Sequence, residues 1–136
     1  MAKSRIVFVA LIAALSLGIA ASVTATGALH TNYLTFSAPF ALPGVALPAG
    51  TYIFEVPIAN SALDVVRVTS RDGRQVYLTA FTRTVERPVG RAPAPVQFAE
   101  VPRGMTPPIK VWYPAGEAIG HEFIYPKGSR QLGRDN

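Results

Sequence analysis

Prolines and glycines interrupt the chain after residue 28 so often that no stretch keeps a helical period over ten or more residues. Residues 37–48 alone contain three prolines and Gly44, which excludes a helix or a long central strand there. Between these breaks lie about six to eight short runs rich in β-branched and aromatic residues. The pattern predicts an all-β fold, either an antiparallel β-sandwich or a small β-barrel.

The expected strands are short and alternate polar with apolar side chains. A further piece, residues 40–42, is short enough to lie along a sheet edge. The strands are expected at residues 30–36, 51–56, 64–70, 75–85, 96–101, 109–113 and 121–125.

Residues 47–54 join a turn to the clearest strand start in the chain. Pro48 fixes φ near −65°, and Gly50 can adopt the positive φ of a type II or bulged turn. In the strand that follows, side chains alternate between two faces. We expect Tyr52, Phe54 and Val56 to be buried, with Thr51, Ile53 and Glu55 on the other face.

The best hairpin signal joins the expected strands 64–70 and 75–85. The turn contains Asp72-Gly73, a pair typical of hairpin turns. Both faces of the second strand are partly apolar, which favours a position within a closed or two-layered sheet over an exposed edge.

The N-terminus has the pattern of an export signal. Lys3 and Arg5 precede an uncharged apolar stretch, residues 6–21, and small residues follow. Val23 and Ala25 fit the −3 and −1 positions of a signal-peptidase site, with Gly27-Ala28 as a nearby alternative. An uncleaved anchor is the competing interpretation, and it would be the chain's one membrane contact.

The resulting division is a signal peptide over residues 1–25, an all-β domain over 29–127 and a disordered tail over 128–136. We therefore expect a periplasmic or secreted protein. The chain has no cysteine, which excludes a lipoprotein anchor, disulfides and thiol chemistry. Loss of Lys3 and Arg5 lowers the formal charge of +5 by two, and the remaining basic residues form no dense block, so nucleic acid is not an expected partner.

Catalytic groups are sparse. His121, Glu122 and Glu117 form the one cluster of acid/base side chains, but neighbouring strand residues point to opposite faces. His30, the other histidine, lies near the predicted mature N-terminus. The chain also lacks a nucleophile elbow and a phosphate-binding loop. We expect no enzyme activity, no metal and no cofactor.

The aromatic residues lie almost entirely on expected strands, which is typical of core packing. A second hypothesis is a stacking platform for sugar rings, in which aromatic side chains stand beside arginine. The candidate ligand-binding residues for such a platform are Tyr77, Phe81, Arg83 and Trp112.

Several motifs together resemble a family of small exported bacterial all-β proteins. The resemblance covers nearly the whole expected mature chain and implies an exported all-β domain, with no catalytic residues to carry over. The motifs are Leu-Thr-Phe-Ser-Ala-Pro at 34–39, Leu-Pro-Ala-Gly-Thr-Tyr-Ile-Phe at 47–54, Val-Gln-Phe-Ala-Glu at 96–100, Trp-Tyr-Pro at 112–114 and Gly-His-Glu-Phe-Ile-Tyr-Pro-Lys at 120–127.

Three functions follow, in order of preference. The first is a non-enzymatic exported domain that binds another protein or a cell-envelope component. The second is a small carbohydrate- or ligand-binding module that uses strand aromatics, with an envelope glycan as its partner. A hydrolase ranks third. Exposure of Trp112, Tyr113 or Tyr77 in a groove would favour the second function, and their burial would favour the first.

Overall fold

The protein is all-β, as expected from its sequence. A computed structural model describes residues 22–26, 31–59, 61–89 and 94–127. Nothing in these ranges forms a helix that could span a bilayer. Residues 1–21 of the predicted signal peptide and the predicted tail at residues 128–136 lie outside the described residues.

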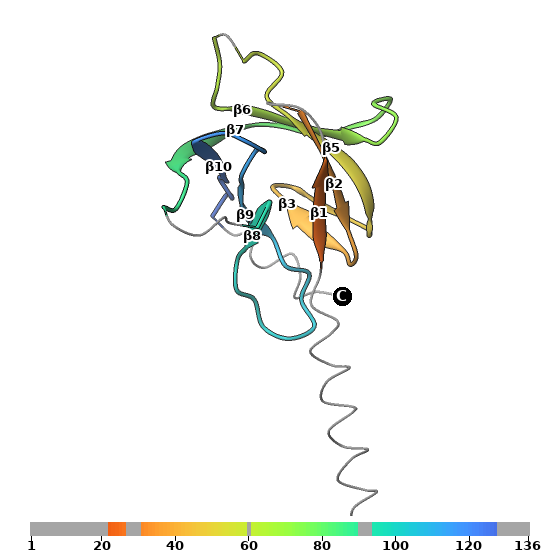
Figure 1. Ribbon diagram of the computed structural model, residues 1–136. Helices are drawn as coiled ribbons and strands as arrows, with labels where there is room; N and C mark the ends of the chain where they lie inside the picture. Colours follow the sequence, from red (N-terminus) through yellow and green to blue (C-terminus); the bar gives the residue numbers. More distant parts are fainter. Residues whose placement is uncertain (1–21, 27–30, 60, 90–93, 128–136) are drawn as a thin grey trace, which may run out of the picture.

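Eight strands form one antiparallel sheet that curls into a nearly closed barrel, in the order β1-β2-β5-β6-β7-β10-β9-β8 (Figure 1). Strand β7 pairs with β6 through its first half and with β10 through its second half, so it joins the two parts of the sheet. The eight strands are β1 (Val23–Thr26), β2 (Thr31–Phe36), β5 (Gly50–Glu55), β6 (Val65–Ser70), β7 (Val76–Glu86), β8 (Val96–Phe98), β9 (Ile109–Trp112) and β10 (Ile119–Phe123).

A two-stranded hairpin of β3 (Phe40–Leu42) and β4 (Val45–Leu47) lies against this sheet. Gly44 makes its turn at a φ of +77°, a conformation that glycine adopts without a steric penalty. The backbone N–H of Ala41 donates to the Pro107 carbonyl at 3.0 Å. This bond ties the hairpin to the chain just before β9.

Two strands were not expected from the sequence. Over residues 37–48 the sequence excludes a helix or a long central strand and names only residues 40–42 as a short edge piece; residues 45–47 also form a strand, β4, by pairing with β3. Val23–Thr26 were assigned to the end of the export signal, and they form β1 on the edge of the main sheet. The β-branched residues of β1 suit a strand as well as they suit a signal-peptide end region.

The predicted register of β5 is confirmed. Tyr52 and Phe54 are buried, and so is Val56 immediately after the strand. The residues between them, including Ile53, are only half-buried. Because a shift of one residue would exchange the two faces, this alternation fixes which side of the sheet is the interior.

Aromatic rings fill that interior. Phe54 contacts Phe36 of β2 at a centroid distance of 6.0 Å and Trp112 of β9 at 5.7 Å. It also meets Phe123 of β10 edge-on at 6.5 Å, while Phe36 stacks on Phe40 at 3.8 Å. Such ring pairs contribute about 0.5–1.5 kcal/mol each beyond the area they bury. Rings from distant parts of the chain therefore hold the barrel together without a disulfide.

Replacing Phe54 by alanine should lower the free energy of unfolding by about 3–5 kcal/mol, because it leaves a cavity between β2, β9 and β10. The matched control is Ile53→Ala on the same strand, which removes a half-buried side chain from the outer face and should cost clearly less. Urea unfolding followed by circular dichroism measures both. Equal losses would mean that Phe54 is not central to the core.

Candidate functional site

A β-bulge determines which of the predicted ligand-binding residues face solvent. The ladder between β6 and β7 shifts at Val68/Thr69: Val68 pairs with Leu78, and Thr69 pairs with Val76. Tyr77 is thus the extra residue of β7, and its ring packs edge-on against Tyr52 at 5.6 Å. Regular alternation would place Tyr77 and Phe81 on one face, but the bulge turns Tyr77 toward the core.

Trp112 and Tyr113 are also unavailable to a ligand. Trp112 is completely buried and stacks on the imidazole of His121 at 5.3 Å. Tyr113 is buried on the opposite side of the sheet, where its ring lies so close to Gly120 that a Cβ there would come within 2.6 Å of its Cδ1. These rings are structural.

Phe81 and Arg83 remain together on the outer face of β7. Both side chains are exposed, and Thr82 between them is buried. Phe81 is 69% exposed, the second largest value among the large hydrophobic residues that the structure describes. The structure thus brings together two of the four predicted residues, whereas Trp112 is fully buried and Tyr77 is half-buried against the core.

Strand pairing places further apolar residues near Phe81. Val65 is its direct partner on β6, and Ile124 follows Phe123, whose partner is Thr82 beside Phe81. The Thr82 N–H donates to the Asp64 carbonyl at 2.7 Å, which brings the preceding residue, Leu63, to the same end of the ladder. We define the Phe81 patch as Leu63, Val65, Phe81, Arg83 and Ile124. The sequence did not predict its three aliphatic members, because only the pairing of the strands brings them near Phe81.

The charges around the patch are balanced. Arg67, two residues along β6 from Val65, forms an ion pair with Glu55, with its Nη2 at 2.6 Å and its Nε at 2.7 Å from Oε1. Arg83 faces Glu122 across the β7–β10 ladder. The surface therefore combines an apolar centre with a nearly neutral polar rim.

Inside the barrel, His121 has a structural position. Its side chain is buried between Trp112 and Thr82, with Nδ1 at 3.3 Å from the Thr82 hydroxyl. The neighbouring Glu122 is only half-buried and pairs with Arg83 across the ladder. Among the described residues no three histidine, aspartate or glutamate side chains gather in a way that could hold a metal ion.

Tyr125 supplies another buried polar contact. Its hydroxyl donates to the Ile109 carbonyl at 2.6 Å, and burial raises the pKa of Tyr125 well above its usual range. The phenol therefore stays protonated at physiological pH and keeps its donor. This contact connects the segment after β10 to the start of β9.

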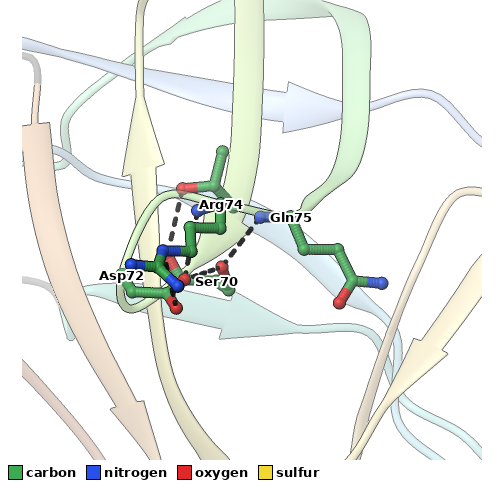
Figure 2. Close-up of polar contacts among 5 residues, drawn as sticks. Ser70, Asp72, Arg74 and Gln75 are labelled. Carbon is green, nitrogen blue, oxygen red and sulfur yellow. Dashed lines mark hydrogen bonds and ion pairs between the residues drawn. The ribbon is translucent and has the colours of Figure 1, made fainter.

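The hairpin turn between β6 and β7 contains a shallow, open hollow lined by Ser70, Arg71 and Asp72. Figure 2 shows that the Asp72 carboxylate of this hollow is used within the turn. Asp72 Oδ1 accepts from the Ser70 hydroxyl at 2.6 Å and from the Arg74 N–H at 3.1 Å, while Ser70 Oγ accepts from the Gln75 N–H at 3.0 Å. Gly73, with a φ of +73°, completes the turn that the sequence predicts.

No family model, curated protein or solved structure matches the chain. The resemblance to small exported bacterial proteins stays a prediction from the sequence motifs. Functional inference therefore depends on the surfaces of this molecule.

The Asp72 turn should make stability pH-dependent. Hydrogen bonds, chiefly from Ser70, lower the pKa of the Asp72 carboxyl, so its stabilising effect is present above the ordinary carboxyl pKa of about 4 and is lost as pH falls through the lowered value. We expect Asp72→Asn to lower the melting temperature slightly at pH 7, with a difference from the wild type that disappears near pH 2.

Ser70→Ala is the control for this test, because it removes the main donor to the carboxylate. It should weaken the same pH dependence, and the double variant should lose less than the sum of the single losses. Melting curves followed by circular dichroism between pH 2 and 7 measure all three variants. If the difference in melting temperature between Asp72→Asn and the wild type stayed constant from pH 2 to 7, it would contradict the role of the Asp72 charge.

Proposed function

We propose that the protein is an exported, non-enzymatic β-domain that binds another protein through the Phe81 patch. The observation that carries the proposal is the exposure of Phe81 at the centre of apolar side chains from two strands and their flanking segments. Contiguous exposed apolar surface with a polar rim is typical of protein interaction sites. Export enters the proposal from the sequence of residues 1–25.

The composition of the patch supports a protein partner. Aromatic residues and arginine contribute most to binding energy at protein interfaces, and Phe81 and Arg83 are adjacent on the outer face. The ion pair of Arg67 with Glu55, and Glu122 opposite Arg83, leave little net positive charge for an anionic membrane or a nucleic acid.

The same geometry disfavours a carbohydrate platform. Sugar rings stack on aromatic side chains that share a face with polar groups, and the bulge removes Tyr77 from the face of Phe81. Trp112 is inside the barrel. Phe81 is left as the one aromatic side chain of the patch.

A photocrosslinking amino acid placed at position 81 in the exporting bacterium tests this proposal. The control is position 76, because Val76 is also exposed and on the same strand, but lies at the far end of β7. We expect one defined envelope or secreted protein to crosslink from position 81 and not from position 76.

The captured protein, once purified, should bind the wild-type domain and lose roughly 30-fold or more in affinity with Phe81→Ser, which corresponds to about 2 kcal/mol. Val76→Ser should bind normally, and both variants should unfold like the wild type because their side chains are exposed. Equal crosslinking from both positions, or unchanged affinity of Phe81→Ser, would refute the Phe81 patch as the binding surface. Binding of purified envelope glycans that Phe81→Ser abolishes would favour the carbohydrate module.

A further inference from the structure

Strand β1 leads us to propose a processing site different from the one that the signal pattern favours. We infer that Val23–Thr26 is a permanent strand of the exported domain, and that the leader is removed before Ser22, at the bond between Ala20 and Ala21. The inference depends on the export part of the proposed function, and it is independent of the Phe81 patch.

The first argument is the backbone pairing of β1. All four of its residues pair with β2, from Val23 opposite Phe36 to Thr26 opposite Tyr33. The pairing extends one residue further, because Ser22 N–H donates to Ser37 Oγ at 2.6 Å and Ser37 N–H donates to the Ser22 carbonyl at 3.1 Å. Ser22 therefore belongs to the paired edge together with β1.

The second argument is what β1 protects. Val23 packs against the core cluster that contains the buried side chains of Leu34 and Phe36. A cut after Ala25 would remove three of the four β1 residues and leave β2 with a row of unpaired N–H and C=O groups. Such an edge is a template for pairing with other chains, and here it would carry the exposed ring of Tyr33.

The third argument comes from the sequence before β1. Gly18 and Ala20 place small residues at the −3 and −1 positions of a cut after Ala20, and the apolar run from residue 6 to 17 precedes them. A signal peptidase would add one water across the Ala20–Ala21 bond, which leaves a carboxylate on Ala20 and an amine on Ala21. The mature chain would then begin one residue before Ser22 and keep all of the described pairing with β2.

The direct test is the intact mass of the processed protein from an exporting bacterium. We expect a chain that starts at Ala21, and we expect Ala20→Leu to block this cut while Ala25→Leu leaves its position unchanged. A chain that starts at Thr26, or anywhere from Ser22 to Thr26, would overturn the site. An uncut chain would overturn it too and would favour the uncleaved anchor. Unchanged partner affinity of Phe81→Ser, in contrast, would refute the Phe81 patch and would not bear on the processing site.

The role of β1 has a second test that needs no export. Chains of residues 21–136 and 26–136 are purified from the cytoplasm and compared by urea unfolding and sedimentation. We expect the shorter chain to lose roughly 5–30-fold in its folded-to-unfolded ratio or to self-associate through β2.

Within the longer chain, Val23→Ala should destabilise more than Thr24→Ala, because Val23 is packed on the core and Thr24 is exposed. This comparison holds even where the shorter chain fails to fold. Equal stability of the two chains as monomers, or equal effects of the two substitutions, would overturn the structural role of β1.

Discussion

The packing of the Phe54 ring is the contact on which the rest of the molecule depends. The sheet has two parts, one around β5 and one around β9 and β10, and Phe54 touches rings from both. A domain without cysteine has no covalent bond to hold such parts together, so burial of large rings must supply the stability. Position 54 lies on the buried face of β5 because the turn at Pro48–Gly50 sets where the strand starts. The Tyr52 hydroxyl stabilises this turn by donating to the Pro48 carbonyl at 2.7 Å.

Polar contacts then fix how the loops close over this core. The side chain of Asn32 is buried and accepts a hydrogen bond from the Ala115 N–H at 3.0 Å, which connects β2 to the loop before β10. Tyr125 connects the end of β10 to β9. Because rings fill the interior and these bonds close its rim, we place binding and pairing on the outer face and the sheet edges. Both proposals follow from this division: the Phe81 patch uses the face, and β1 covers an edge.

The sequence predicted those parts of the fold that depend on local patterns. The alternation in β5 and the Asp72-Gly73 turn are local, because side-chain period and turn geometry are properties of a few consecutive residues. The bulge at Val68/Thr69 is not local. It depends on how two strands align, and no residue type near Tyr77 indicates a bulge. For this reason the sequence placed Tyr77 beside Phe81, and the structure places it beside Tyr52.

The two unexpected strands have a related explanation. β4 is three residues long and exists through its pairing with β3, so its sequence has too few positions to show a period. β1 has the small and β-branched residues that also mark the end of an export signal, and the sequence favours the signal where both interpretations fit. Likewise, burial of Trp112 and exposure of Phe81 depend on which strand faces point into the barrel, and the patterns around these residues do not determine that.

Native-state hydrogen exchange tests most directly whether the Phe54 core unites the two parts of the sheet. If it does, the central amides of β5 and β6 and those of β9 and β10 should exchange through one global opening, with the same free energy. Phe54→Ala should lower the protection of both groups equally. Exchange of β9 and β10 at a distinctly lower free energy, unaffected by Phe54→Ala, would show two independently stable parts and contradict a barrel held together by this ring.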